Sequence, residues 1–447
     1  MRIPHPLRGL YEESGALPVI RRSLNFMLIG NIFGQLFGIV CGGGTAAVIG
    51  LATSMGASDL TFSIIMAVTQ GAALLQIPFS LLVNRTHKRK RYMLTIGLGS
   101  RVFWLLLGLI PILVPEIVPN IRVFTMVFLI GISCCMSAVI NVSWFPWFSE
   151  IVPLTIQSRF IALRDVILNG VNFVGGIVIS LLLDYLPPET KYIIVFIIGG
   201  SAGILDMVSF GFCKEVYKSP PRKTRFSETL GSILKNKPFL RFMLYWTAYN
   251  FTSSFMTVYM NPYSINVMGL TFTEITVFGS IAGAVSAIIA LPQWGKAIYH
   301  YGSKNVFVIA GIGATTVTLF YLFSSPHNVW PVFFRNLIGA WFWSGANVAA
   351  TNEQLMLSPE ETRPTYIAVF SCMTALFGAS FGSLASGFTL NLIKASGWFT
   401  GWFDSYKALF VLAVLLRAIV MVTLIPGLTN DNQKKLPDLI RAIFRRK

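Results

Sequence analysis

Apolar runs of about 20 residues recur along the whole chain and constrain its fold more than any other sequence feature. A helix of that length spans the roughly 30 Å hydrocarbon core of a bilayer. Between the runs lie turn-forming or charged residues. We expect spanning helices near residues 24–52, 60–83, 92–114, 121–145, 159–183, 190–213, 239–265, 273–293, 305–324, 328–350, 365–393 and 404–427.

The composition excludes the soluble alternatives. Hydrophobic residues make up 54% of the 447 residues and charged residues only 12%, whereas soluble domains carry about 25% charged residues. A globule cannot bury so much apolar surface, which excludes a soluble enzyme, a disordered chain and a disulfide-rich secreted module. The sequence therefore predicts an all-α polytopic membrane protein with twelve transmembrane helices.

The basic residues predict the orientation. The formal net charge is +17, from 35 Lys and Arg against 18 Asp and Glu. Cytoplasmic loops carry an excess of Lys and Arg, and only four basic residues would fall on the outer side if both termini were cytoplasmic: Arg122, Lys191, Lys394 and Lys407. We expect a multi-pass protein of the cytoplasmic (inner) membrane with both ends inside, and no nucleic-acid partner.

An internal repeat divides the chain in two. Residues 80–89 match residues 295–304 at a constant offset of 215 residues, and each segment would lie between the second and third helix of its half. A basic, proline-containing loop separates six spans from six. We expect a six-helix half at 1–213, a cytoplasmic linker at 214–238, a second six-helix half at 239–428, and a basic tail at 429–447 on the membrane surface.

The loop between the second and third helices resembles the signature of the major facilitator superfamily, Gly-x-Leu-Ala-Asp-Arg-x-Gly-Arg-Lys. The chain departs from it at Ser80, Asn84 and His87, and it keeps Leu82, Arg85, Lys88 and Arg89. The resemblance implies two pseudo-symmetric six-helix halves that transport a solute by rocker-switch alternating access. It also implies that Asn84, Arg85, Lys88 and Arg89 form a gating loop, although Asn84 lacks the charge of the family's Asp.

Four helices carry polar and aromatic stripes at helical spacing. Residues three or four apart share a helix face, and the stripes lie in the first, fourth, seventh and tenth helices, which line the central cavity in the superfamily that the chain resembles. Polar side chains in spans also serve only to join helices, at about 0.6 kcal/mol each. The candidate substrate-binding residues are Asn31, Gln35, Ser137, Asn141, Tyr249, Asn250, Arg335, Asn336 and Trp343.

Charged residues inside the spans need a partner or a wet cavity. Arg335 lies about 9 Å deep at 1.5 Å per residue, so it contacts the substrate or a gate, or else pairs with a carboxylate such as Glu274 or Asp404. Asp165 is the candidate proton carrier, and an ion pair at the helix end is the alternative. For two further arginines, Arg101 and Arg417, we expect pairing or snorkelling.

Small residues form two further stripes. Gly378 and Gly382 share a face of the eleventh helix, and Gly279 and Gly283 share a face of the eighth. Such faces allow helix backbones to approach closely. We expect close helix packing at both.

The sequence predicts a secondary transporter without enzymatic activity. The four histidines are scattered and no cysteine spacing suggests a metal site, so we expect no cofactor and no metal. The solute stays open between an anion and a sugar or amphiphile, coupled to a proton, to sodium or to an exchanged solute. We expect a monomer among membrane lipids. The rival hypotheses are a transport-inactive receptor or scaffold of the same fold and a membrane-embedded lipid-modifying enzyme.

Overall fold

A computed structural model describes residues 18–79, 89–115, 120–152, 154–213, 226–359 and 362–428. These residues are almost entirely helical, which confirms the all-α prediction. Their contacts divide the chain into two compact units, Met1–Ala57 with Ala72–Lys223, and Ser58–Gly71 with Thr224–Lys447. Each unit is described by itself.

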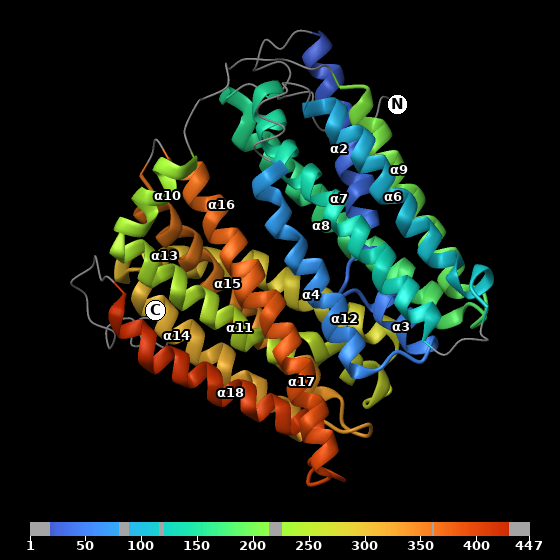
Figure 1. The fold of residues 1–447 in the computed structure, drawn as a ribbon. Coiled ribbons are helices and arrows are strands. Elements are labelled where there is room, and N and C mark those ends of the chain that lie inside the picture. The colour runs from blue at the N-terminus through green and yellow to red at the C-terminus, as the bar shows by residue number, and fades with distance from the viewer. Residues whose placement is uncertain are drawn as a thin grey trace. The chain divides into compact units, whose positions relative to one another are not determined.

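The first unit is a bundle in which α6 packs against α7 and α9, and α2 packs against α8 and α9 (Figure 1). Its elements are α2 (Pro18–Val40), α3 (Ala46–Ser54), the 3₁₀ turn η1 (Ala72–Leu75), α6 (Arg89–Leu113), α7 (Ile121–Ile151), α8 (Leu154–Tyr185) and α9 (Lys191–Gly211).

The second unit is organised around α11, which packs against α17 and α18, while α15 packs against α14 and α12 (Figure 1). Its elements are α4 (Asp59–Gly71), α10 (Phe226–Lys235), α11 (Lys237–Asn266), α12 (Phe272–Val285), the π turn η2 (Ser286–Ala290), α13 (Leu291–Tyr301), α14 (Ser303–Thr316), the 3₁₀ turn η3 (Val317–Phe323), α15 (Trp330–Leu357), α16 (Arg363–Met373), the π turn η4 (Thr374–Ser380), α17 (Phe381–Ser396), α18 (Ser405–Leu424) and the 3₁₀ turn η5 (Ile425–Gly427).

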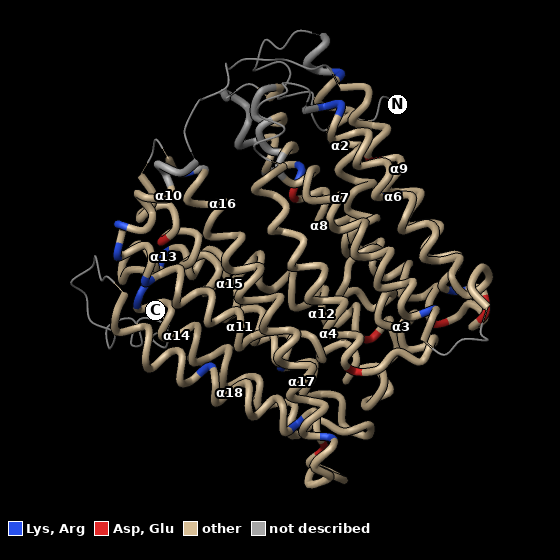
Figure 2. Tube along the Cα trace, viewed as in Figure 1, with Lys and Arg blue, Asp and Glu red and all other residues tan. Residues whose placement is uncertain are grey.

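The helices are long and apolar enough to make this a multi-pass membrane protein. Ten helical segments of the described chain satisfy both criteria, and charged positions are sparse along them (Figure 2). The two remaining predicted spans are α11 and α15, which are 30 and 28 residues long. Both are long enough to cross a bilayer, and their lower hydropathy reflects the tyrosines, asparagines and serines that form their polar stripes. Twelve helices are therefore consistent with the structure.

The first predicted span differs from the expectation of one continuous helix over 24–52. The helix ends at Val40, and a second helix begins at Ala46 after three consecutive glycines, at positions 42–44. Glycine destabilises a helix by about 1 kcal/mol relative to alanine, so three in a row favour a break. Thr45 caps the new helix by accepting a hydrogen bond from the backbone amide of Val48 at 3.4 Å.

The helix α4 belongs to the second unit, although it precedes most of the first unit in the sequence. It packs against α17, η4 and α11. Three polar contacts hold it: Ser63 Oγ lies 2.7 Å from the Tyr259 hydroxyl, Ser380 Oγ donates to the Ala67 carbonyl at 2.8 Å, and Asp59 pairs with Lys394. The Asp59 carboxylate also accepts a hydrogen bond from the Tyr406 hydroxyl.

The two small-residue stripes have different surroundings. A Cβ atom added at Gly382 would lie 2.7 Å from the Phe251 carbonyl oxygen, so α17 and α11 are in backbone contact there. Gly378 has similarly close neighbours on α11. At Gly279 and Gly283, the described residues place nothing within 4 Å of such a Cβ. Close packing is therefore confirmed for the eleventh predicted helix, whereas in the eighth no described neighbour within the second unit approaches Gly279 or Gly283.

We predict that Gly382→Ala lowers the melting temperature of the purified protein, because the obstacle is backbone and cannot rotate away. Overpacking of this kind costs about 1–3 kcal/mol. Gly279→Ala is the matched control and should leave the melting temperature unchanged or raise it, since alanine favours the helix. Equal melting temperatures for the two variants would contradict the packing described here.

Candidate functional site

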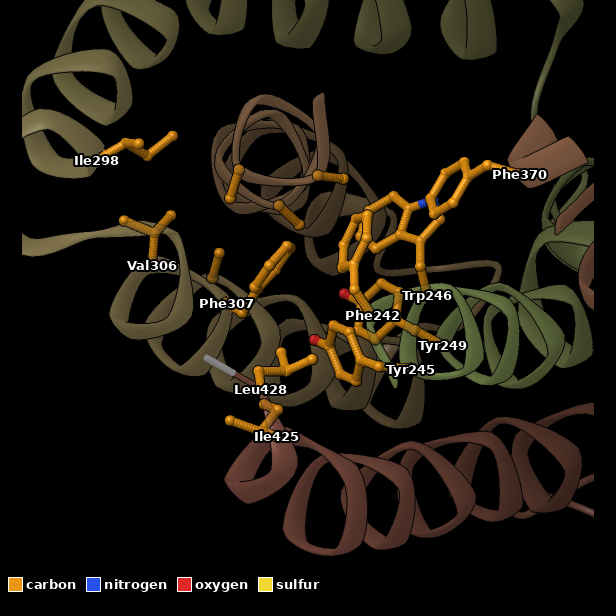
Figure 3. Close-up of a cluster of buried hydrophobic side chains, with 14 of the residues drawn as sticks. Phe242, Tyr245, Trp246, Tyr249, Ile298, Val306, Phe307, Phe370, Ile425 and Leu428 are labelled. Carbon is orange, nitrogen blue, oxygen red and sulfur yellow. The ribbon is translucent and has the colours of Figure 1, made fainter. Parts of the chain in front are cut away.

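A stack of aromatic rings forms the centre of the second unit. Trp246 and Tyr249 are three residues apart on α11 and therefore lie on one face of that helix. Their ring centroids are 5.5 Å apart, and Trp343 of α15 stacks on Tyr249 at 5.8 Å and on Trp246 at 6.3 Å. Figure 3 shows Tyr245, Trp246 and Tyr249 projecting from α11 beside Phe307 of α14. Two predicted site helices, α11 and α15, thus meet at these rings.

The predicted residues of α11 differ in exposure. Tyr249 is fully buried and its hydroxyl has no hydrogen-bond partner among the described residues. Asn250 is half-buried, and its amide donates to the Trp246 carbonyl of its own helix at 2.8 Å. Trp343 is half-buried as well. In this conformation Tyr249 is part of the core, while Asn250 and Trp343 keep surface that a solute could contact.

Arg335 is half-buried near the start of α15. Its guanidinium donates to Asn336 Oδ1 at 3.0 Å and to Met256 Sδ at 3.7 Å. The guanidinium carbon lies 5.6 Å from the centre of the Tyr321 ring, within the range of a cation–π interaction. The structure thus brings together two predicted residues of α15 and surrounds the cation with neutral groups.

The carboxylates that could have paired with Arg335 have other roles. Glu274 accepts from the Thr271 backbone amide at 2.8 Å in a capping box at the start of α12. Asp404 caps α18 by accepting from the amides of Tyr406 and Lys407 at 2.8 and 2.9 Å. In the described part of the chain, no carboxylate lies within ion-pair distance of Arg335. The positive charge is therefore available to an anion.

Arg417 is a second buried cation, and its inward position was not expected. It is 5% exposed in α18 and neither snorkels nor pairs with a carboxylate of the described residues. Its Nη1 donates to the Ala314 carbonyl at 3.4 Å, and its guanidinium carbon lies 5.2 Å from the centre of the Tyr249 ring. In the sequence, Arg417 is a single arginine in an apolar run, so its neighbours do not indicate which face of the helix is buried.

Two predicted site residues of the first unit make hydrogen bonds to neighbouring helices. Gln35 of α2 donates its amide to Asn172 Oδ1 of α8 at 3.1 Å. Ser137 of α7 lies 2.7 Å from Ser100 of α6, hydroxyl to hydroxyl. The Ser137 contact is the helix-joining role that competed with substrate binding in the sequence interpretation.

The other two predicted residues of the first unit have no described partner on another helix. The Asn31 amide donates to the Met27 carbonyl of its own helix at 2.6 Å, and the side chain is half-buried. Asn141 of α7 is exposed. Both therefore keep polar surface that a solute could use.

A buried ion pair joins α6 and α9. Arg101 Nη2 lies 3.3 Å from Asp206 Oδ2, and the guanidinium carbon lies 3.7 Å from the centre of the Phe37 ring of α2. Both side chains are at least nine-tenths buried. The expected pairing of Arg101 is confirmed, and the charges of the pair neutralise each other within the bundle.

Asp165 lies on α8, where its carboxylate accepts two hydrogen bonds from Arg164 at 2.7 and 2.9 Å. Its side chain is 49% exposed. The structure thus contains the ion pair that was the alternative to a proton-carrying role.

The predicted gating loop falls largely outside the described residues. This applies to Asn84, Arg85 and Lys88, while Arg89 is the first residue of α6. The next residue of α6 makes a described contact with another helix. Lys90 donates to the carbonyls of Gly211 and Cys213 at the end of α9, at 2.8 and 2.6 Å.

The second unit repeats this lysine contact. Lys304, at the start of α14, donates to the carbonyls of Pro426 and Leu428 at the end of the α18 segment, at 3.1 and 2.8 Å. The last carbonyls of a helix lack partners and attract cations. Each unit therefore uses a lysine at the start of one helix to satisfy the end of another, although the repeat's offset of 215 residues aligns Lys304 with Arg89, one position before Lys90.

A family model described as Major Facilitator Superfamily matches residues 28–383, most of the chain. The chain belongs to the Major Facilitator Superfamily. No curated protein matches its sequence. The family prediction is thereby confirmed, and the superfamily member is a secondary active transporter.

Solved structures agree with the superfamily fold. A mutant of the nucleoside transporter NupG is 10% identical with a TM-score of 0.71, covering 91% of this chain and 100% of that one. A bacterial homolog of the human lysosomal transporter Spinster, inward-facing and occupied, is 14% identical with a TM-score of 0.70, covering 94% and 100%. A D-xylose-proton symporter is 12% identical with a TM-score of 0.64, covering 93% and 100%.

We predict that Asp206→Asn destabilises this transporter strongly, because it leaves the Arg101 charge buried without compensation. Breaking a buried ion pair from one side costs about 3–5 kcal/mol, so the melting temperature of the purified protein should fall by many degrees. The double variant Arg101→Leu/Asp206→Leu removes both charges and should recover most of the loss. A double variant no more stable than Asp206→Asn would show that the pair is not the source of the effect.

Proposed function

We propose that this superfamily member transports a small solute with an anionic group and that Arg335 binds this group. The observation that supports the proposal is the half-buried guanidinium of Arg335 without a carboxylate in ion-pair distance among the described residues. A cation in a partly dry site attracts an anion far more strongly than it would in water. The remaining predicted residues, Asn31, Gln35, Ser137, Asn141, Tyr249, Asn250, Asn336 and Trp343, would supply polar and aromatic contacts.

A sugar or drug-like amphiphile is the second candidate solute, because the rings of Trp246, Tyr249 and Trp343 offer an aromatic surface. The similar structures include a nucleoside transporter and a D-xylose-proton symporter. Solutes of such different chemistry on one fold leave the choice to the side chains of the site.

We further propose alternating access of two six-helix halves, 1–213 and 239–428, in the cytoplasmic membrane with both termini inside. Coupling would use a proton, sodium or an exchanged solute, and Asp165 is the candidate proton carrier. The chain would act as a monomer and catalyse no covalent reaction. Solute counterflow in proteoliposomes of the purified protein tests transport itself, and its absence would favour a receptor or scaffold.

We predict that Arg335→Ala reduces uptake of an anionic solute at least about tenfold, since truncating one side of a charge pair costs about 2–5 kcal/mol. Arg335→Lys should restore uptake only in part, because an ammonium replaces a two-pronged guanidinium. Uptake is measured in membranes with matched expression, across a panel of anionic, neutral and cationic solutes.

The control for this experiment is Arg241→Ala, which removes an exposed arginine from α11 in the same unit. It should leave uptake and solute selectivity unchanged. Full uptake with unchanged selectivity in Arg335→Ala would remove Arg335 from the site. The aromatic and amide residues would then be the remaining candidates for solute binding.

We predict that the loop before α6 controls conformational exchange and not solute affinity. Replacing Arg85 and Lys88 with alanine should slow transport yet leave affinity within about threefold, a change of roughly 0.7 kcal/mol. The neighbouring Lys90 supports this proposal, because its ammonium satisfies carbonyls at the end of α9. Transport rate and solute binding are measured separately on the same preparation.

A suitable control is Lys235→Ala, an exposed lysine at the end of α10. It removes one positive charge without touching the loop, and both rate and affinity should stay at their original values. A tenfold loss of affinity at an unchanged rate in the Arg85/Lys88 variant would exclude the gating role.

A further inference from the structure

Arg417 and Tyr249 place two unsatisfied polar groups together inside the second unit. Arg417 Nε and the Tyr249 hydroxyl are both buried without a hydrogen-bond partner among the described residues. The guanidinium lies over the Tyr249 ring at 5.2 Å, so the hydroxyl at the ring's edge is near the cation. Buried polar groups are almost always hydrogen-bonded, and two such exceptions on side chains in cation–π contact indicate a missing partner.

The charge of Arg417 also lacks compensation. Among the described residues its guanidinium donates to the Ala314 carbonyl alone, and that hydrogen bond is long at 3.4 Å. In the part of α18 and its neighbours that the structure describes, no carboxylate lies within ion-pair distance of the guanidinium. A cation–π contact returns only part of the free energy that burying an unpaired ion costs. The partner that is missing should therefore be negatively charged.

Arg335 and Arg417 are related by a regular spacing. Arg417 contacts Tyr249 of α11 and Ala314 of α14, and Arg335 contacts Met256 and Tyr321. Each contact of Arg335 follows the corresponding contact of Arg417 by seven residues, which is two helical turns, or roughly 10 Å. The two guanidiniums thus lie along the same two chain segments at two levels, and their charges repel each other.

We propose that the Arg417 guanidinium and the Tyr249 hydroxyl bind a small anion, two helical turns along α11 from Arg335. The anion is a carboxylate or a halide, small enough for a site between packed helices. Guanidinium and hydroxyl donate to it, and its charge compensates Arg417 and weakens the repulsion from Arg335. A free inorganic ion would act as a bound co-ion. If the anion is instead a carboxylate group of the solute, the inference rests on the transport function proposed above.

The stacked tryptophans provide a direct readout. Trp246 and Trp343 contact Tyr249, and iodide is both an anion and a quencher of tryptophan fluorescence. When iodide replaces gluconate at constant ionic strength in purified full-length protein, we expect the quenching of tryptophan fluorescence to contain a component that saturates with iodide concentration. The component should disappear in Arg417→Met and shift to at least fivefold higher iodide concentration in Tyr249→Phe. Arg241→Met, the exposed control, should behave like the original protein.

Thermal stability provides a second measurement. An anion that binds only the folded state raises the melting temperature with its concentration, so chloride should stabilise the original protein more than gluconate does, and Arg417→Met should lose this difference. If Arg417→Met does not fold, Arg417→Lys replaces it: the charge remains without the Nε donor, and iodide binding should weaken at least fivefold. Absence of saturable quenching in the original protein, or unchanged quenching in the Arg417 and Tyr249 variants, overturns the proposal.

Two further arms identify the source of the anion. If acetate displaces iodide and solute uptake does not depend on chloride, the site receives a carboxylate of the solute. If uptake requires chloride, the ion is an inorganic co-ion. The iodide titration needs no transported solute, so it decides this proposal even if Arg335→Ala shows that the transporter does not carry anions.

Discussion

The hydrocarbon core of a membrane offers no hydrogen-bond partners, so each backbone group and charge of a spanning helix must be satisfied within the protein. The described residues show three solutions. Hydroxyls return to carbonyls of their own helix, as Thr315 does to Gly311 at 2.7 Å. The charge of Arg101 meets that of Asp206. Lysines at helix starts reach the exposed carbonyls at other helix ends. The packing of each unit depends on these pairings.

Two arginines of the second unit depart from this rule. The guanidiniums of Arg335 and Arg417 lie at two levels of this unit without a carboxylate partner in the described chain, and the hydroxyl of Tyr249 is buried beside Arg417. The helices that carry Arg335 and Tyr249 are the least apolar of the predicted spans. Stability alone would favour apolar residues at these positions, which is why such exceptions point to a function in a transporter.

The sequence predicted the helices from the length of the apolar runs and the family from the signature in the loop between the second and third helices, and tertiary packing changes neither. It also predicted which residues share a face, as for Gly378 and Gly382, which both lie close to α11. It could not predict what covers a face: Ser137 bonds to Ser100 of a neighbouring helix, and Gly279 has no close neighbour although Gly382 has one. The inward orientation of the Arg417 side chain could not be predicted for the same reason, since the residues around it in α18 are uniformly apolar.

The contacts of Lys90 and Lys304 bear on the history of the chain. The acceptors are backbone carbonyls, which every residue type provides, so the contact tolerates almost any substitution at the accepting end. The aligned signature positions, by contrast, hold Asn84 in one half and Tyr299 in the other. After a duplication, interactions with the main chain can thus outlast those between side chains.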